Sequence, residues 1–522
     1  MLNRQSSVYQ LRLVKALALT IGMFALAWKL AGWIVDGNST DLTLAAIAAI
    51  GVAFSIALIK DWRYGVYCFL VWLVFEDLIR KFTGNGVALF FAKDVILGLT
   101  YVAMWIAFRE RRLLAFKPPF LLSLIIFFCV GVLEVFNTNI PNVIYGLLGL
   151  KLYFYYVPLM FAGYALLRSE EDLYKILMLN TWIALIIAGL GVAQSVLGLS
   201  FLNPTEQASD LRLLSTAVRT TPLSHLHVER PTSVYVSDGR FAEALILFFV
   251  LVIGTCGYLL MRGSRGRKLV FPTVGIVVLA TVMGGVRHAF ISILASSVIW
   301  IAAVLWGSGR RLNELFRVGK AIRLITFFAS VAVVFMIFLF PDAIQARWAL
   351  YTETLTPGTS TSDLGFRAWE YPVANLVSVF TQPNWQFGNG IGTASLGTQY
   401  VSRLIGARPP EFASESGYGG LILEFGIVGP VLWLLWTGSL LTCAWRVVLK
   451  LKKTPLFSIG FALFWYAVYI LALGIFYGLP IYQNYLSNAY LWLTIGMLFR
   501  LPGLLPQQTP SAPVPAQVTA RS

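Results

Sequence analysis

Long apolar runs separated by short polar connections dominate this sequence. A helix needs about 20 mostly apolar residues to cross the hydrocarbon core of a bilayer, and by that measure we count about fourteen spans. The pattern predicts an all-α, polytopic transmembrane helical bundle with a large helical outer loop before the last three spans. The predicted spans lie near residues 12–34, 42–59, 64–80, 93–108, 120–136, 148–167, 176–198, 240–261, 268–286, 288–306, 322–341, 418–445, 456–478 and 484–500.

The distribution of Lys and Arg between these runs predicts the orientation of the bundle. Both residue types resist translocation and therefore collect in cytoplasmic connections. Alternate connections are basic, which places both termini in the cytoplasm and the long connections 199–239 and 342–417 on the outer side. Arg80, Lys81 and Lys93 break this rule in one outer connection. The basic connections fall near residues 60–63, 109–117, 168–175, 262–268, 310–323 and 446–453.

The chain divides into blocks of spans and loops. Its last block is rich in Pro, Gln, Ala and Ser without apolar periodicity, which predicts a disordered cytoplasmic tail. No small-residue cleavage site follows the basic N-terminus before Trp33, so we predict a retained first span. The predicted blocks are N-terminal spans 1–198, outer loop 199–239, spans 240–341, large outer loop 342–417, C-terminal spans 418–500 and tail 501–522.

Composition supports a membrane protein and narrows its partners. The chain is 58% hydrophobic and 12% charged, whereas soluble domains are about 25% charged. The net charge of +16 would suit nucleic acid, but most of the cations lie between apolar runs as orientation signals, so we predict no nucleic-acid partner. His225 and His227 have no nearby third ligand, and the four cysteines lie inside apolar runs. The sequence therefore predicts no metal site, no disulfide framework and no cofactor.

Cations at the outer membrane boundary form the first candidate site. Arg287 and His288 occupy a minimal turn between two spans, where a cation is costly unless it snorkels or meets an anion. A planar guanidinium matches phosphate oxygens, so Arg287 is a candidate diphosphate clamp, with an interfacial anchor as the alternative. Arg230 and Arg240 flank the entry to the span that follows the first outer loop, either as substrate ligands or as partners of a loop ion pair.

The large outer loop combines a cation, aromatic side chains and glycines. Arg367 and Trp369 lie in one short stretch, and both are candidate substrate-binding residues. Trp369 either stacks on a sugar ring or belongs to the core of the loop or to an interfacial belt. The Gly-x-Gly-x-Gly segment at 388–392 neither follows a strand nor opens a Rossmann-type helix, so we expect its glycines to allow close backbone approach instead of nucleotide binding.

Carboxylates crowd the entry to the span near 418–445. Ser414 or Ser416 is the predicted N-cap of that helix, and the positive end of the helix favours a carboxylate such as Glu415. Glu424 lies about two turns further along, where an ionised carboxylate is costly without a partner. We therefore expect Glu424 to face the bundle interior, paired with Arg or with backbone.

Together these segments resemble the superfamily of O-antigen ligases and O-antigen polymerases. The shared features are many spans, a short outer turn with Arg, a late outer loop with Arg and Gly-x-Gly-x-Gly, and a final helix entry that ends in Glu-x-Gly-x-x-Gly. The resemblance is firmest over about 230–430. In the ligases this loop ends with His followed by Asn, Ser or Gln, then nine arbitrary residues and Gly-x-x-Gly. Here the frame is Glu415-Ser416, nine residues and Gly426-Ile-Val-Gly429, so glutamate replaces the histidine.

The resemblance implies a metal-independent, inverting glycosyltransferase of the bacterial inner membrane, with its active site on the periplasmic face. Its donor would be a glycan on undecaprenyl diphosphate, with Arg287 and Arg230 on the diphosphate and Glu415 in place of the catalytic histidine. Such a donor carries an activated leaving group, so the protein must stabilise the departing diphosphate and deprotonate an acceptor hydroxyl.

The missing histidine favours a polymerase of lipid-linked repeat units, from O-antigen, capsule or exopolysaccharide, over a lipid A–core ligase. A lipid-linked oligosaccharide flippase also has about fourteen spans and is the alternative from another class; it would need polar residues lining a cavity at mid-depth in both halves. Membrane lipid, a chain-length regulator and a separate flippase are the expected partners of a polymerase.

The predicted topology has a direct test. A cysteine introduced at Ser360 in the large outer loop should react with a membrane-impermeant thiol reagent added to intact spheroplasts. Labelling only after permeabilisation would invert the predicted orientation.

Overall fold

Helices make up most of the described chain, and their bounds follow the apolar runs. The computed structural model describes residues 55–505, apart from 84–86, 205–217, 263–265, 308–318, 357–361, 363, 407–409, 411, 413 and several positions within 321–336. The helices are α3 Trp62–Thr83, α4 Val87–Arg109, α5 Leu121–Glu134, α6 Val143–Phe154, α7 Leu159–Leu166, α8 Glu170–Leu197, α10 Asp238–Arg262, α11 Arg267–Gly284, α12 Arg287–Gly307, α14 Pro341–Leu355, α15 Tyr371–Ser378, α16 Thr398–Ile405, α17 Gly417–Phe425, α18 Val428–Lys450, α19 Phe457–Val468, α20 Ile475–Tyr477, α21 Leu479–Gln483 and α22 Tyr485–Arg500.

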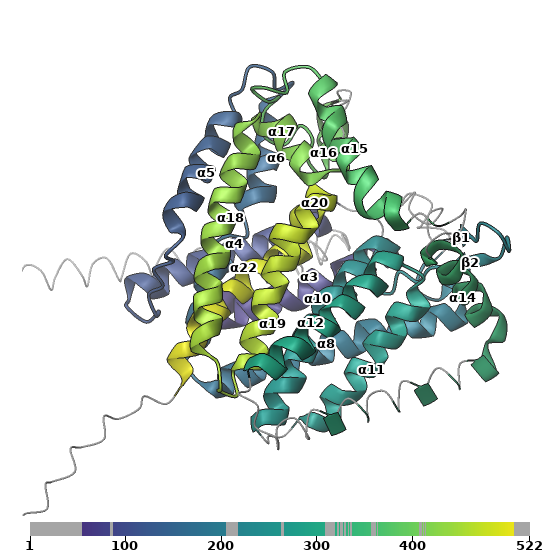
Figure 1. The fold of residues 1–522 in the computed structure, drawn as a ribbon. Coiled ribbons are helices and arrows are strands. Elements are labelled where there is room, and N and C mark those ends of the chain that lie inside the picture. The colour runs from purple at the N-terminus through teal and green to yellow at the C-terminus, as the bar shows by residue number, and fades with distance from the viewer. Residues whose placement is uncertain are drawn as a thin grey trace, which may run out of the picture.

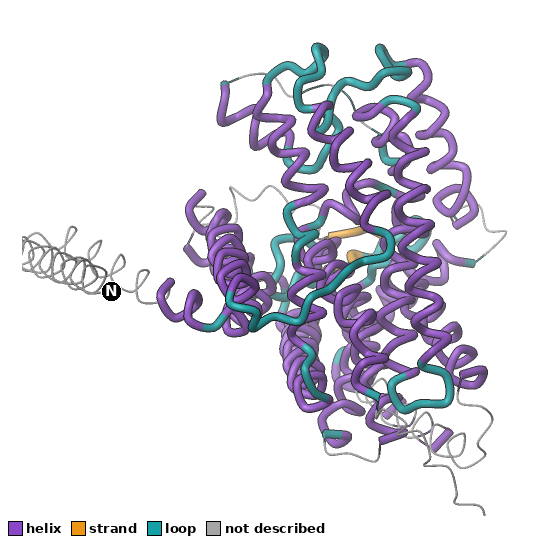
Figure 2. Tube along the Cα trace, turned by 90° about the vertical axis from the view of Figure 1, so that its left-hand side faces the viewer, coloured by secondary structure: helices purple, strands orange, loops and turns teal. Residues whose placement is uncertain are grey.

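Short π-helical, 3₁₀ and strand segments complete the described chain. Two π-helical turns are η3 Phe366–Glu370 and η5 Tyr469–Gly474. A two-stranded hairpin in the first outer loop, β1 Val218–Thr220 and β2 His227–Glu229, is an exception to the predicted all-α class (Figure 2). The 3₁₀ turns are η1 Leu199–Phe201, η4 Val379–Thr381 and η6 Leu501–Leu504.

The structure confirms the helical membrane class in its coarse form. Within the described ranges, eight helices are long and apolar enough to cross a membrane. The predicted span 12–34, most of 42–59, half of 322–341, most of the tail, and Ser360 lie outside the described residues. The total of about fourteen spans and the orientation of the bundle therefore stay predictions.

Two of the predicted spans are each divided into two helices at a proline or a glycine. The span near 148–167 is divided into α6 and α7 at 155–158, next to Pro158, which has no N–H to donate. The span near 418–445 is divided into α17 and α18 at Gly426, whose φ of +67° lies in the left-handed region. The second break matters for function because it makes α17 a separate short helix.

The elements gather into an interior bundle and an outer end. Helix α10 lies in the centre, with nearly all of its residues buried, and packs on α8, α11, α12, α19 and α22. In Figure 1 α5, α6, α15, α16 and α17 gather at the upper end, while the hairpin and α14 lie at the right. The described part of the loop 342–417 contains α14, η3, α15, η4 and α16, so its predicted helical character is confirmed there, while 382–397 is irregular.

A buried ionic network explains the cations that break the orientation rule. Arg80, Lys81 and Lys93 do not lie in a loop, because α3 and α4 extend beyond the predicted spans and include them. Lys93 Nζ donates to Glu76 Oε1 at 3.0 Å and Arg80 Nη1 to Asp77 Oδ1 at 3.1 Å, and all four side chains are buried. Pairing allows these charges to lie inside helices.

The same network holds the first outer loop against the bundle. Lys81 Nζ donates to Thr232 Oγ1 at 2.9 Å and to the Ser233 carbonyl at 2.7 Å. Gln194 Oε1 in α8 accepts from the backbone N–H groups of Thr232 and Ser233 at 2.8 and 2.7 Å. Because these partners are buried, the chain directly after Arg230 is fixed between α3 and α8.

Helices α7 and α22 approach each other backbone to backbone. A Cβ built on Gly496 would lie 1.9 Å from the Met160 carbonyl oxygen, and one built on Gly163 would lie 2.1 Å from the Leu493 carbonyl oxygen. Small residues at such crossings are typical of membrane helix pairs. The two glycines therefore set the distance between these helices.

We expect Gly496→Ala to destabilise the protein by about 1–3 kcal/mol, the usual cost of overpacking. Gly189→Ala in α8 is the matched control, because a Cβ there meets nothing within 4 Å. Thermal unfolding of the detergent-solubilised proteins measures both. Equal midpoints for the two variants would contradict the close approach of α7 and α22.

Candidate functional site

The β-hairpin brings Arg230 to the turn that precedes Arg287. Gly285, in the turn between α11 and α12, has a φ of +62°. A Cβ built there would lie 3.2 Å from Val228 Cγ1 and 3.7 Å from Arg230 Cγ. The hairpin therefore rests on the turn that leads directly into Arg287, the first residue of α12.

Arg347 of α14 holds the hairpin and the end of α11 together through hydrogen bonds. Its Nε donates to the Met283 carbonyl at 2.6 Å and its Nη2 to the Glu229 carbonyl at 2.9 Å. The side chain is 4% exposed, so these bonds form in a largely water-free environment, where they are worth more than at the surface. One guanidinium thus joins α14, the end of α11 and β2.

Four arginines share one electrostatic neighbourhood, which we call the arginine cluster: Arg219, Arg230, Arg287 and Arg367. The charge of Arg230 lowers the pKa of Arg219, and burial, Arg287 and Arg367 act in the same direction. Asp238 opposes them and forms an ion pair with Arg230 at 2.8 Å. Like charges held close disfavour their ionised forms, so an anion entering the cluster would be stabilised.

Arg230 is itself only partly satisfied. Its Nη1 binds Asp238, while its buried Nε has no hydrogen-bond partner in the part of the chain that the structure describes. A buried donor without a partner costs free energy, and an incoming oxygen ligand would remove that cost. Both predicted roles of Arg230, loop ion pair and anion ligand, are therefore compatible with its geometry.

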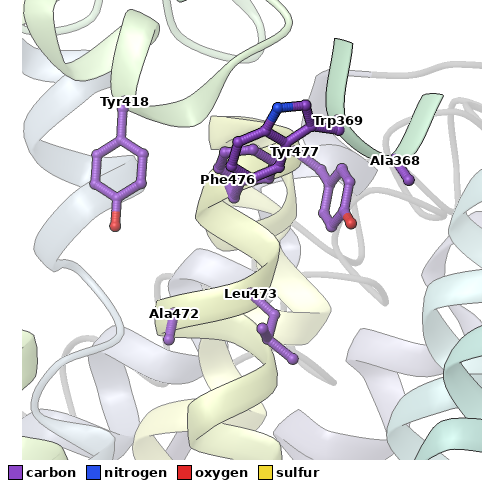
Figure 3. Close-up of a pocket in the computed structure, with 7 residues that line it drawn as sticks. All are labelled: Ala368, Trp369, Tyr418, Ala472, Leu473, Phe476 and Tyr477. Carbon is purple, nitrogen blue, oxygen red and sulfur yellow. The ribbon is translucent and has the colours of Figure 1, made fainter. Parts of the chain in front are cut away.

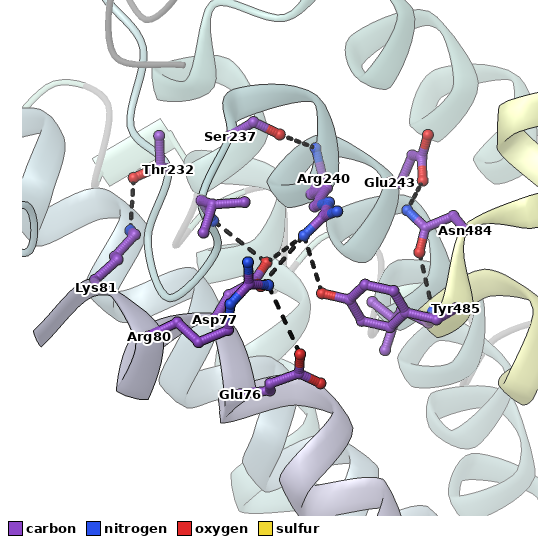
Figure 4. Close-up of polar contacts among 12 residues, drawn as sticks. Glu76, Asp77, Arg80, Lys81, Thr232, Ser237, Arg240, Glu243, Asn484 and Tyr485 are labelled. Atoms are coloured by element: carbon purple, nitrogen blue, oxygen red, sulfur yellow. Dashed lines mark hydrogen bonds and ion pairs between the residues drawn. The ribbon is translucent and has the colours of Figure 1, made fainter. Parts of the chain in front are cut away.

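Arg240 and His288, the other two basic residues predicted at this boundary, lie in different surroundings. Arg240 points into the ionic network, where its Nη1 binds both carboxylate oxygens of Asp77 at 2.9 and 3.2 Å and the Tyr485 hydroxyl at 3.1 Å (Figure 4). Arg240 therefore forms an ion pair, which is one of the two roles predicted for it. His288 is exposed in the first turn of α12, directly after Arg287.

The frame from Glu415 to Gly429 forms one short helix and its two ends. Ser416 is the N-cap of α17, and its side chain accepts from the Gly419 N–H at 3.4 Å, as predicted for one of the two serines. The nine intervening residues are α17 itself, and Gly426 ends it. Glu415 is exposed directly before the N-cap, next to the positive end of the helix.

The Gly-x-Gly-x-Gly segment supports the far end of α17. A Cβ on Gly388 would lie 2.6 Å from Gly426 N, and one on Gly392 would lie 2.0 Å from the Tyr145 carbonyl oxygen in α6. The N–H of Asn389 donates to the Leu423 carbonyl at 2.7 Å. The glycines thus allow close backbone approach, as expected, and the segment fixes α17 between α6 and α18.

Glu424 is buried at the end of α17 and is fully engaged by neutral groups. Its Oε1 accepts from Ser395 Oγ at 2.6 Å and from the Ala394 N–H at 3.1 Å, and its Oε2 accepts from the Tyr153 hydroxyl at 2.9 Å. The prediction that it faces the interior is confirmed, with hydroxyls and backbone as its partners. Its role is to join α17, α6 and the glycine segment.

Tyr371 links Glu415 to the arginine cluster. A hydrogen bond from the Tyr371 hydroxyl to the Glu415 carboxylate raises the pKa of Tyr371. The guanidinium of Arg367 lies over the Tyr371 ring, 4.9 Å from its centroid, and its charge also acts on Arg219. Tyr371 thus lies between Glu415 and Arg367, and the charge of Arg367 also reaches Arg219 of the hairpin.

An open aromatic pocket of about 310 Å³ is lined by residues of η3, α17, η5 and α20. Trp369 of η3 and Phe476 of α20 stack on each other with ring centroids 5.6 Å apart, and Tyr418 and Tyr477 complete the aromatic lining (Figure 3). Trp369, predicted to bind substrate, is 66% exposed. Its exposure excludes the alternative in which it forms the core of the loop.

Sequence reasoning missed Arg219 and Tyr371. Arg219 lies in the same predicted outer connection as Arg230, where a cation is unexpected, so a signal for it was available. Tyr371 is not among the candidate site residues predicted from the sequence. Its bond to Glu415 joins residues 44 positions apart by their numbers, which no local pattern reveals.

Comparisons with known proteins assign no family to the chain. No family model matches the chain, and no curated protein sequence matches it. The function must therefore be argued from the residues of the site.

We expect the arginine cluster to bind inorganic pyrophosphate. Arg219→Ala should weaken binding about tenfold, since a bond between charged groups contributes about 1.5–3 kcal/mol. Arg112→Ala is the control, because Arg112 is 72% exposed and pairs locally with Glu110. Calorimetric titration at low salt measures the affinity, and equal affinities in both variants would contradict an anion site at the cluster.

Proposed function

We propose that the protein is a glycosyltransferase that polymerises lipid-linked oligosaccharide repeat units on the outer face of the inner membrane. The observation that carries this proposal is the connection of the arginine cluster to Glu415 through Arg367 and Tyr371. It supplies one region that suits a diphosphate and, beside it, a carboxylate that can accept a proton. The donor is a glycan on a polyprenyl diphosphate, for which undecaprenyl diphosphate is the bacterial candidate.

The chemistry requires two groups to act together. The acceptor hydroxyl oxygen forms a bond to the anomeric carbon of the donor, while the bond from that carbon to the diphosphate oxygen breaks and its electron pair leaves with the diphosphate. Glu415 takes the hydroxyl proton. The guanidinium groups of Arg219, Arg230 and Arg287 stabilise the negative charge that develops on the leaving group. Attack opposite the departing diphosphate inverts the anomeric centre, as in inverting glycosidases with water replaced by a sugar hydroxyl.

Tyr371 contributes orientation instead of proton transfer. The raised pKa keeps the Tyr371 hydroxyl protonated at neutral pH, so that it can donate to the Glu415 carboxylate. The Glu415 N–H also donates to Asn375 Oδ1 at 3.4 Å, so α15 holds the residue at both its backbone and its side chain. A base placed in this way needs little reorganisation when the acceptor arrives.

A lipid A–core ligase would use the same donor and a different acceptor. The glutamate at position 415, where the ligase frame has histidine, favours the polymerase. A chain-length regulator and a flippase that delivers the repeat units are the partners that a polymerase would need.

A lipid-linked oligosaccharide transporter is the second candidate function. One observation favours it: Glu76, Asp77 and Lys93 are fully buried ionisable residues inside the bundle, and such residues often mark transport pathways. In this network they are paired with one another, with Arg80 and with Arg240. This pairing agrees better with support of the outer loop than with an open substrate path.

Glu415→Gln and Arg287→Ala should each abolish polymer formation while the protein is still produced. Loss of a general base costs about 10²–10⁴-fold in rate, and loss of a charge-stabilising donor about 10²–10³-fold. Asp342→Asn, an exposed carboxylate at the start of α14, is the control and should retain activity.

The measurement is incubation of purified protein with lipid-linked repeat units, followed by separation of the products as a ladder. A normal ladder from both site variants would contradict the catalytic assignment. Movement of the lipid-linked unit across proteoliposome membranes without a ladder would favour the transporter.

A further inference from the structure

The aromatic pocket next to Glu415 has the composition of a sugar-ring site. Trp369 and Phe476 offer stacked ring faces, and the phenol groups of Tyr418 and Tyr477 provide hydrogen-bonding positions in the same wall. Its volume of about 310 Å³ lies at the lower end of the range for ligand pockets. It therefore has room for a single sugar residue instead of a whole repeat unit.

Two π-helical turns meet at this pocket. Ala368 and Trp369 belong to η3, and Leu473 belongs to η5, which continues directly into α20. Single π-helical turns are rare and occur frequently at functional sites. Trp369 is 66% and Tyr477 48% exposed, so these large apolar faces stay in contact with solvent unless a ligand covers them.

The pocket lies beside the proposed base. Tyr418 follows Glu415 by three positions, and the Glu415 carbonyl oxygen lies 3.6 Å from a Cβ built on Gly478, the residue after Tyr477. Arg367, which belongs to the arginine cluster, directly precedes Ala368 and Trp369 of the pocket. The diphosphate of an anionic donor would thus bind the arginines, while a neutral acceptor would occupy the aromatic pocket.

We propose that this pocket is the acceptor subsite, in which one sugar ring of the incoming glycan packs on the exposed face of Trp369 and presents a hydroxyl to Glu415. This inference rests on the proposed function. The C–H face of a pyranose packs on aromatic rings, while its hydroxyls reach the phenols at the rim. An isoprenoid chain would gain the apolar contact but would leave those phenols without a polar partner, so the wall favours the sugar.

The experiment separates acceptor from donor by using two forms of the repeat unit. The lipid-linked unit is the donor, and the same glycan released from its lipid by mild acid is the soluble acceptor. Purified Trp369→Ala should show a KM for the soluble glycan raised about fivefold to tenfold, which corresponds to the loss of one aromatic stacking contact. The KM for the donor should not change, and Trp369→Phe, which keeps a ring face, should restore most of the loss.

Trp348→Ala is the matched control, because Trp348 is 69% exposed on α14 and does not line the pocket. A raised donor KM with an unchanged acceptor KM would overturn the proposal and assign the pocket to the lipid. Equal constants in the Trp369 and Trp348 variants would overturn it as well. Wild-type protein that releases no polyprenyl diphosphate from the donor would instead refute the proposed function itself, and the acceptor subsite with it.

Discussion

The packing of the β-hairpin on the turn between α11 and α12 is the constraint on which this end of the protein depends. Arg219, Arg230, Arg287 and Arg367 come from a hairpin, a helix start and the large outer loop, and their charges act on a shared region that includes Asp238. Such a region is unfavourable unless packing enforces it or an anion occupies it. The hairpin packs on the tight turn at Gly285, and Arg347 forms hydrogen bonds with both the hairpin and the end of α11. The fold thus holds several guanidinium groups in one region, which is the basis for the proposed diphosphate site.

The rest of the outer end keeps a carboxylate at a fixed distance from that region. A nine-residue helix with a serine N-cap and a glycine end sets the position of Glu415, and the glycine segment and Glu424 fix the far end of that helix on α6. The Tyr371 hydroxyl lies next to the Glu415 carboxylate, and this contact raises the pKa of Tyr371. Motif residues that look catalytic in a sequence, such as the repeated glycines, therefore have a structural role here, because their backbone passes within contact distance of two helices.

The buried ionic network connects this outer end with the interior. Asp77 accepts from Arg240 at the start of α10, and Lys81 holds the chain just after Arg230. Buried charges contribute little net stability when compared with apolar packing, but they specify one arrangement of α3, α8 and α10 through directed bonds. Positioning of the outer loop is thus a sufficient physical reason for charged residues in these helices.

The sequence by itself determined the class of fold and most of the cations of the site. Apolar periodicity located α8, α10, α11, α12 and α22 to within a few residues, because burial in lipid or in a bundle requires that periodicity whatever the neighbours are. Arg230, Arg287 and Arg367 stood out because cations are expensive at that boundary. Only the tertiary structure decided that Arg80 and Lys93 are buried, that Arg240 turns towards Asp77, that Arg219 lies near Arg230, and that Tyr371 meets Glu415. These contacts join residues far apart in the chain, and local pattern carries no information about which distant partners a side chain meets.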